Sequence, residues 1–230
     1  MSKKYFIIAI AILVLAVLSA GGFLAYKKGY LKMEKELKPE DLLAFEIKKK
    51  DLDQEIVKIY QAKYEQVKIL LEKNPDSFNE WLALAVFKKG VGDFEGARDI
   101  YLYCQKIRPN SSVPLVGLAD LYLYYFNDAG KAEAYLKQAM TIDQNDYFLI
   151  LRLAEIYRYK MPGKEALYEQ TILGGLQKFP DNIDLTSALA TYYRQTEQIE
   201  KAIQYYEKLV ALDPSNKTAK DDLEELKKKQ

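Results

Sequence analysis

Prolines recur at a fixed interval along this chain. Pro75 and Pro109 are 34 residues apart, and the same interval separates Pro180 from Pro214. Gln144 lies between the two pairs, 35 residues after Pro109 and 36 residues before Pro180. Self-similarity with a period of roughly 20–50 residues indicates one supersecondary unit copied along the chain, because such a unit cannot bury its apolar face alone. The chain is therefore expected to fold as a stack of similar units.

Each period carries two helical patterns, one after the other. The first is a leucine–alanine pair followed by an aromatic ring: Leu84-Ala85 with Phe87, Leu118-Ala119 with Tyr122, Leu153-Ala154 with Tyr157, and Leu189-Ala190 with Tyr193. The second is a triad spaced by four and then three residues: Ala97, Tyr101 and Cys104; Ala132, Leu136 and Ala139; Ala202, Tyr206 and Leu209. Residues at these spacings share one face of an α-helix. Each unit is therefore predicted to be a pair of amphipathic helices.

The phased set resembles the tetratricopeptide repeat, whose first helix carries Trp, Leu-Gly/Ala and Tyr and whose second carries Ala, Phe/Tyr, Ala and Pro. Four units are assigned, at residues 78–111, 112–146, 147–182 and 183–216. The first matches closely, with Trp81, Leu84, Ala85, Gly92, Ala97, Tyr101 and Pro109. The third is looser, because Met161-Pro162-Gly163 lengthens its inter-helix turn and Gly174-Gly175 occupies its small-residue stretch. The resemblance implies an all-α, right-handed solenoid of helix-turn-helix repeats.

Segments on either side of the four units are expected to close the array. Residues 39–77 predict a degenerate N-terminal helical unit with one apolar stripe, formed by Val57, Tyr60, Tyr64, Val67 and Leu71. Lys63 replaces the alanine of the repeat, so this segment is either a diverged repeat or one long packing helix; a coiled coil has only about two heptads in its favour. Residues 217–230 predict a capping helix, with Ala219, Leu223 and Leu226 against the last repeat and a charged outer face.

A stretch without charged side chains follows the N-terminal tail, residues 1–4. Residues 5–26 would span about 33 Å as a helix, close to the hydrocarbon thickness of a bilayer. We expect a single-pass transmembrane helix there, followed by a charged connector at residues 27–38. The alternative is a cleaved signal peptide comprising residues 1–20, with the small residues Ser19-Ala20-Gly21 at the cleavage site. The apolar run resumes beyond that site at Phe23-Leu24, which favours a retained anchor.

The lysines around residues 5–26 give opposing cues about membrane orientation. Lys3 and Lys4 favour a cytoplasmic N-terminus with the bulk of the chain outside. The opposite orientation is favoured by lysines on the downstream flank, which are Lys27, Lys28, Lys32, Lys35 and Lys38. We expect the repeats to be extracytoplasmic, while the orientation stays open.

Composition excludes several kinds of chemistry. The chain has no histidine and a single cysteine, Cys104, so Ser-His-Asp and Cys-His catalytic sets, histidine-based metal sites and an intramolecular disulfide cannot form. A formal net charge of +1 gives no signature of nucleic-acid binding. No motif indicates catalysis, a metal or a cofactor, so we expect a non-enzymatic protein. Cys104 occupies a small-residue position and is expected to be buried.

The resemblance also implies where a partner would bind. In this family the first helix of each unit lines a concave groove through its positions two, five, nine, twelve and thirteen. The candidate peptide-binding residues in this sequence are Asn79, Leu82, Val86 and Lys89; Val113, Val116, Asp120, Leu123 and Tyr124; Phe148, Leu151, Glu155, Arg158 and Tyr159; and Asp184, Ser187, Thr191, Arg194 and Gln195. The groove would be apolar at the first unit, aromatic in the middle, and polar at the far end. The Lys/Asn clamp that relatives use for chaperone tails is absent, because its positions hold Leu82, Val86, Val113 and Gly117.

These features predict a membrane-tethered protein–protein interaction module or scaffold, which binds a peptide or helix of an unidentified protein within a membrane protein complex. It resembles tethered repeat proteins that serve secretion or envelope assembly. The alternative is binding of a small ligand, a lipid or glycan, or a role as accessory subunit of an envelope enzyme or secretion complex. Self-association is a third possibility, since solenoids can stack end to end. The polar capping helix argues against it at the C-terminal end only.

Overall fold

The computed structural model describes residues 37–229, which form helices and irregular connections without a β-strand. The chain divides into two compact units, residues 1–38 and 39–230, and the described helices all lie in the second unit. These helices are α2 Pro39–Leu42, α3 Gln54–Lys73, α4 Phe78–Gly90, α5 Phe94–Ile107, α6 Val113–Tyr124, α7 Ala129–Ile142, α8 Tyr147–Tyr159, α9 Ala166–Lys178, α10 Ile183–Gln195, α11 Ile199–Leu212 and α12 Lys217–Lys227. The expected all-α fold is confirmed for this part of the chain.

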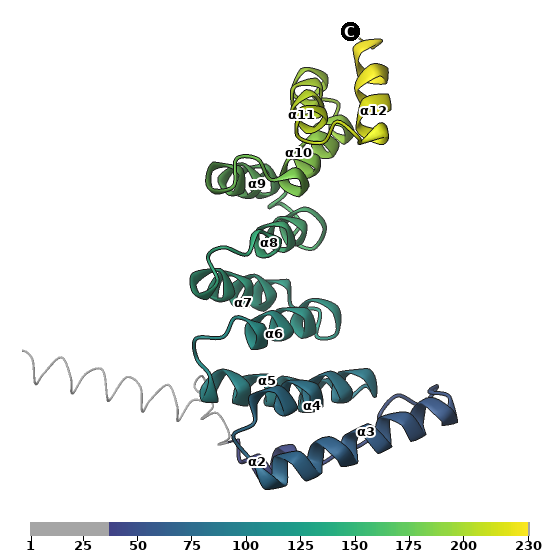
Figure 1. Cartoon of the computed structure of the whole chain (residues 1–230), viewed down its shortest axis with the longest axis vertical. Coiled ribbons are helices and arrows are strands. Elements are labelled where there is room, and N and C mark those ends of the chain that lie inside the picture. The colour runs from purple at the N-terminus through teal and green to yellow at the C-terminus, as the bar shows by residue number, and fades with distance from the viewer. Residues whose placement is uncertain (1–36, 230) are drawn as a thin grey trace, which may run out of the picture. The chain divides into compact units, whose positions relative to one another are not determined.

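Helices of the second unit pack as consecutive hairpins (Figure 1). Within the hairpins, α4 packs against α5, α6 against α7, α8 against α9, and α10 against α11. The second helix of each hairpin also packs against the first helix of the next one, so that α5 contacts α6, α7 contacts α8, and α9 contacts α10. This arrangement is the helical repeat array that the period of about 34 residues predicts.

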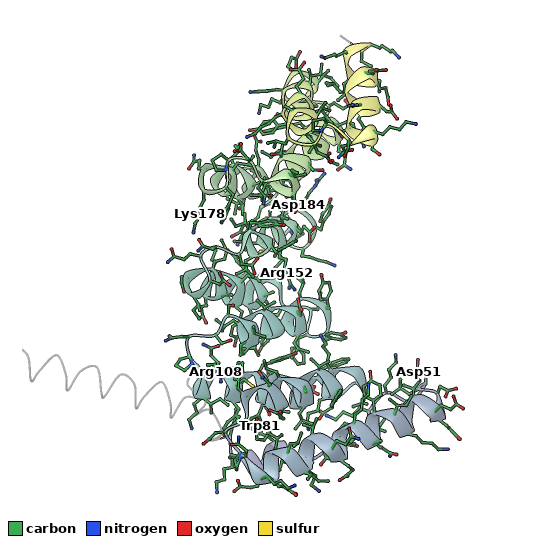
Figure 2. The ribbon with its side chains drawn as sticks, viewed as in Figure 1. Asp51, Trp81, Arg108, Arg152, Lys178 and Asp184 are labelled. Carbon is green, nitrogen blue, oxygen red and sulfur yellow. The ribbon has the colours of Figure 1, made fainter. Side chains whose placement is uncertain are left out.

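The positions that define the sequence period form the buried seam between these helices. All four leucine–alanine pairs are buried, and so are the triads on α5, α7 and α11. Trp81, which Figure 2 labels on α4, is almost fully buried. Its indole Nε1–H donates a hydrogen bond to the carbonyl of Pro75 at 2.7 Å, and its ring meets the edge of Tyr103 with centroids 5.0 Å apart. Cys104 is buried as expected, and burial raises the pKa of its thiol to about 12.

Two glycines lie where neighbouring helices approach closely. A Cβ atom at Gly117 on α6 would lie 2.5 Å from the ring of Tyr101 on α5, so a larger residue would push these helices apart. A Cβ atom at Gly175 on α9 would lie 3.0 Å from Ile150 on α8, whereas Gly174 faces open space. Of the paired glycines in the third hairpin, Gly175 is therefore the one that the packing requires to be small.

Short polar side chains and prolines mark the ends of the helices. A backbone N–H in the first turn of α3, α5, α7, α8, α10 and α12 donates a hydrogen bond to Asp53, Asp93, Asp128, Asp146, Asn182 and Asn216, respectively. These caps satisfy donors that have no partner inside the helix. Each of the four periodic prolines lies two residues beyond the last residue of a helix, after α3, α5, α9 and α11. The periodic prolines therefore mark the C-terminal ends of these four helices.

The N-terminal end of the array, residues 39–77, is not a regular helical hairpin. The four-residue α2 is followed by an irregular segment, residues 43–53, which we call the strap, and then by the long helix α3. The Tyr64 hydroxyl on α3 donates a hydrogen bond to the carbonyl of Leu43, and the Tyr64 ring stacks on Phe45 with centroids 4.3 Å apart. The sequence is consistent with either a diverged repeat or one long packing helix in this segment. In the structure the segment contains one long helix, α3.

A buried ion pair fixes the strap to the first hairpin. The Lys88 ammonium lies 2.9 Å from the Asp93 carboxylate and also donates a hydrogen bond to the carbonyl of Ala44. Lys48 of the strap pairs with the same carboxylate at 2.7 Å. Burial alone would raise the pKa of Asp93, but the hydrogen bonds from Lys48 and Lys88 outweigh burial and lower it. Through these contacts the strap is bound to the end of α4 and to the turn between α4 and α5.

The C-terminal helix α12 covers the last hairpin. Its buried residues are Ala219 and Leu226, and it packs on α11. Asp222 accepts a hydrogen bond from the Tyr206 hydroxyl at 2.9 Å and pairs with Arg194 on α10 at 2.5 Å. One face of α12 therefore contacts the array while its other face is charged and exposed.

The predicted N-terminal tail and transmembrane helix, residues 1–4 and 5–26, lie outside the described residues. The same holds for the predicted connector, residues 27–38, apart from its last two residues. Among the helices between residues 37 and 229, none has the combination of length and apolar character that crossing a bilayer requires.

Candidate interaction groove

The candidate groove residues come from the first helices of the four hairpins. Helix α4 carries Asn79, Leu82, Val86 and Lys89; α6 carries Val113, Val116, Asp120, Leu123 and Tyr124; α8 carries Phe148, Leu151, Glu155, Arg158 and Tyr159; and α10 carries Asp184, Ser187, Thr191, Arg194 and Gln195. These helices are first in every hairpin because the leucine–alanine pattern precedes the triad in every period. Their exposed members include Asn79, Val86, Tyr124, Glu155, Tyr159 and Gln195.

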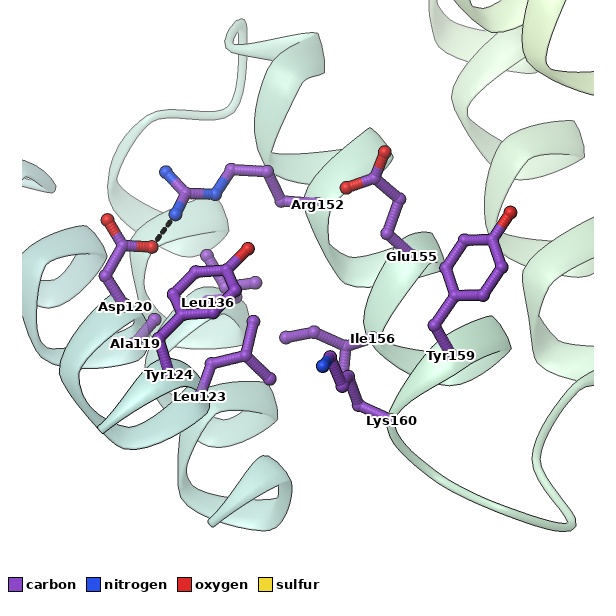
Figure 3. A pocket seen from close by; sticks show the side chains of 10 residues that line it. All are labelled: Ala119, Asp120, Leu123, Tyr124, Leu136, Arg152, Glu155, Ile156, Tyr159 and Lys160. Atoms are coloured by element: carbon purple, nitrogen blue, oxygen red, sulfur yellow. Dashed lines mark ion pairs between the residues drawn. The ribbon is translucent and has the colours of Figure 1, made fainter. Parts of the chain in front are cut away.

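A pocket of about 100 Å³ lies between α6 and α8, next to α7 (Figure 3). Five of the candidate residues line it: Asp120, Leu123, Tyr124, Glu155 and Tyr159. Residues from two successive hairpins therefore meet at one hollow, which is what stacking of similar units makes possible.

The pocket combines an apolar lining with a charged rim. Its apolar side chains are Ala119, Leu123, Leu136 and Ile156. Tyr124 and Tyr159 are 63% and 64% exposed, an unusual degree for side chains of this size. Glu155 and Lys160 also line the pocket, and neither forms an ion pair with any residue between 37 and 229. An incoming group can thus contact apolar surface and two charges of opposite sign.

Arg152, which the sequence analysis missed, forms an ion pair with Asp120 across the pocket (Figure 3). Burial lowers the pKa of Arg152, while the nearby charge of Glu155 acts in the opposite direction. Arg152 occupies position six of its unit, which the family pattern does not assign to the groove. Its partner Asp120 is position nine of the preceding unit, so the contact depends on how far α8 is shifted along α6. The spacing of residues along the sequence does not indicate that shift.

Arg158 lies in a separate cluster beside the pocket. Its guanidinium carbon is 5.1 Å from the ring centroid of Tyr159, 4.9 Å from that of Tyr168 and 5.0 Å from that of Tyr192. It also donates a hydrogen bond to Gln195 at 2.5 Å. These contacts come from α8, α9 and α10, so Arg158 joins the third hairpin to the fourth. It is not among the residues that line the pocket.

Arg194 likewise has a partner within the array. Its ion pair with Asp222 attaches α10 to the capping helix, and its guanidinium lies 5.8 Å from the ring centroid of Tyr206. The polar far end expected from Arg158 and Arg194 is therefore made of arginines that already contact the protein. The remaining candidates lie on the first helices but not at the pocket: Asn79, Leu82, Val86, Lys89, Val113, Val116, Phe148, Leu151, Asp184, Ser187, Thr191 and Gln195.

Between residues 37 and 229 there is no group of three or more cysteine or acidic side chains placed to hold a metal ion. The groups that the site offers are a small apolar hollow, two exposed tyrosine rings and charged side chains. This chemistry suits recognition of another molecule by contact.

Comparison with known proteins supports the fold. Residues 187–216 match the family described as Tetratricopeptide repeat. No curated protein matches the chain by sequence. The solved structure of MamA protein has a TM-score of 0.53 and 13% identity, covering 70% of this chain and 86% of that chain. PilW, described as a widely conserved type IV pilus biogenesis factor, has a TM-score of 0.52 and 18% identity, covering 71% of this chain and 73% of that chain.

The C-terminal part of a TPR repeat-containing protein from Cytophaga hutchinsonii is also similar. Its TM-score is 0.51 with 22% identity, and the match covers 69% of this chain and 65% of that chain. At these identities the likeness concerns the fold alone. With the buried seam, it supports a helical repeat array like that of tetratricopeptide-repeat proteins, in which residues 187–216 match that family by sequence.

Proposed function

We propose that this protein is a non-enzymatic interaction module that binds a peptide or helix of a protein partner along α4, α6, α8 and α10. The pocket between α6 and α8 would hold the anchoring side chain of that partner. The observation that carries this proposal is the pair Tyr124 and Tyr159, two highly exposed rings at equivalent positions on either side of an apolar hollow.

The free pocket exposes two large aromatic rings, those of Tyr124 and Tyr159, to water. Exposed tyrosines and arginines are the side chains that most often dominate binding energy, because they offer large contact area at a modest entropic cost. Covering Leu123 and the rings of Tyr124 and Tyr159 with a partner side chain would remove apolar surface from water. Glu155 and Lys160 at the same pocket would then select partners with charges of complementary sign.

The proposal can be tested by co-purification of partners with the full-length chain. We expect a stoichiometric protein partner that is lost when Tyr124→Ala and Tyr159→Ala are combined. Tyr125→Ala is the matched control, because Tyr125 is also exposed but stacks on Phe94 outside the pocket. Arg158 is left unchanged, since its replacement would disturb contacts between hairpins. Retention of the partner by the double variant would contradict the proposal.

Binding of a small ligand is the second candidate, favoured by the size of the pocket. A hollow of about 100 Å³ has room for a small apolar group. Native mass spectrometry of the purified chain would distinguish the two functions. A co-purifying lipid or glycan that disappears in the Tyr124/Tyr159 double variant would favour the small ligand, and an empty pocket would favour a protein partner.

We also propose that the module is tethered to a membrane by residues 5–26, with the repeats on the extracytoplasmic side. The support is in the sequence, where 22 consecutive residues lack a charged side chain. Alkaline carbonate extraction should leave the chain in the membrane fraction, and protease added to intact cells should digest the repeats only if they are outside. Release of the chain by carbonate would contradict the tether.

A further inference from the structure

Among the helices between residues 37 and 229, α3 lacks the long preceding partner helix that α5, α7, α9 and α11 each have. Helices α5, α7, α9 and α11 each pack on the helix that precedes them and also contact the helix that follows. Helix α3 packs on the following helix, α4, but the described residues before it, 37–53, form only the short α2 and the strap. Tyr64 and Leu71 of α3 are buried, while another face of this 20-residue helix stays open.

Six residues on that open face have the spacing of a coiled-coil seam. They alternate by three and four positions, all six are exposed, and we call them the α3 stripe: Ile56, Ile59, Lys63, Gln66, Leu70 and Lys73. Ile56, Ile59 and Leu70 are 40%, 48% and 49% exposed. Apolar residues at this spacing let one helix pack along another. The stripe is therefore shaped to receive a helix.

We propose that the occupant is α3 of a second copy of this chain, packed antiparallel to the first. In this arrangement Ile59 of each copy contacts Leu70 of the other, and Lys63 of each lies beside Gln66 of the other. Glu55, at the start of the helix, comes next to Lys73, near its end, at both ends of the pair. Ile59 and Leu70 thus meet apolar residues, Lys63 meets a neutral amide, and Lys73 lies opposite Ile56 with its charge beside Glu55.

Chemical complementarity also decides the direction of pairing. A parallel pair would place Lys63 against Lys63 and Lys73 against Lys73, and like charges at a seam are unfavourable. In the antiparallel pair the polar layer of Lys63 and Gln66 has a matched counterpart in only one register. A single polar layer of this kind is known to specify register in helix pairs. Two helices about 30 Å long make a small interface, so we expect reversible dimerisation.

The test is sedimentation velocity of the full-length chain in dodecyl maltoside over a range of concentrations. We expect a monomer–dimer equilibrium that Ile59→Lys abolishes. Glu55→Lys and Lys73→Glu should each raise the dissociation constant about three- to tenfold, as expected for an unfavourable charge contact. Combining the two reversals should restore the wild-type constant, because the opposite charges meet again in the dimer.

The double reversal distinguishes the dimer from an effect on the helix itself. Each reversal opposes the helix dipole, so a folding effect would be worst in the double variant. Glu65→Lys, on a different face of α3, is the matched control and should leave the dissociation constant unchanged. Circular dichroism of each variant would establish that α3 remains folded.

Three results would overturn the proposal. The first is a wild-type chain that stays monomeric at every concentration. The second is a dimer that Ile59→Lys leaves intact. The third is a double reversal that is weaker than either single change, which would exclude the antiparallel register. A monomeric chain whose thermal stability falls in Ile59→Lys would instead assign the stripe to another segment of the same chain.

Discussion

Tyrosine–glutamate hydrogen bonds join neighbouring hairpins at equivalent positions. The Tyr157 hydroxyl on α8 donates to Glu133 on α7 at 2.8 Å, and the Tyr193 hydroxyl on α10 donates to Glu169 on α9 at 2.7 Å. Both contacts span 24 residues, so they are copies of one interaction within the repeat period. At the residue scale, the period therefore preserves polar contacts between hairpins as well as apolar ones.

Replacement of Glu133 by glutamine should destabilise the array. Burial alone would raise the pKa of Glu133, but hydrogen bonds from Lys137, Tyr157 and Lys164 outweigh it and lower the pKa to about 2. We expect Glu133→Gln to lower the free energy of unfolding by about 1–3 kcal/mol at pH 7, because the amide leaves the two lysines without a counter-charge. Urea unfolding would measure this change, with Glu65→Gln on the exposed face of α3 as the control.

The same carboxylate predicts a pH dependence. Its pKa is lower in the folded state than the ordinary value of 4.5, so its ionised form stabilises the fold fully above pH 4.5. That contribution is lost as the pH falls from about 4.5 toward 2. The difference in stability between the wild type and Glu133→Gln should therefore shrink over this interval. A difference that stays constant from pH 7 to pH 3 would contradict the assigned role.

Single residues could be predicted from the sequence where the period itself places them. Trp81, Tyr101 and Tyr206 repeat at positions that must face the seam, and all three are buried. Arg152 could not be predicted in the same way, because its ion pair with Asp120 depends on how adjacent helices are offset. The aromatic contacts of Arg158 were missed for a related reason, since Tyr168 and Tyr192 come from two other helices.

At the scale of the elements, the strap depends on one buried carboxylate. Asp93 accepts the backbone N–H of Gly96 at the start of α5 and pairs with Lys48 and Lys88. We expect Asp93→Asn to lower the free energy of unfolding by about 2–4 kcal/mol, because Lys88 would be buried without a counter-charge. Fluorescence of Trp81, the only tryptophan in the chain, would follow unfolding of this end of the array.

A double variant separates the ion pair from other effects of this change. Combining Asp93→Asn with Lys88→Met removes both charges, so it should cost less stability than Asp93→Asn alone. If the double variant were less stable than the single one, the loss would have to come from the helix cap or from packing. The strap would then be held by its backbone contacts with Val91.

The ends of the helices could be predicted well from the sequence, whereas the conformation of the strap could not. The periodic prolines each follow a helix by two residues because proline cannot continue one. Residues 43–53 carry no helical period, and what places them is a set of contacts with residues far along the chain, such as Lys48 with Asp93. Such nonlocal ion pairs leave no periodic trace in the sequence.

At the scale of the whole array, the helices of each hairpin contact those of the adjacent hairpins. In a repeat array each unit touches only the units beside it, so a hollow between units forms where two adjacent hairpins meet. The pocket between α6 and α8 is of this kind. The sequence predicted which helices would contribute, because the first helix of each unit is defined by its pattern. It could not predict which pair of hairpins would leave a hollow, since that depends on side-chain volumes from three helices.

Carbodiimide cross-linking of the unmodified chain, read out by mass spectrometry, tests the stacked array most directly. The reagent joins only carboxylates and lysines that already touch. We expect links between adjacent elements, including Glu133 with Lys164 and Glu169 with Lys201, whose charged atoms lie 3.0 Å and 3.2 Å apart. Intramolecular links between hairpins that are not neighbours, such as α4–α5 with α8–α9 or α10–α11, would show a compact bundle and would contradict the array.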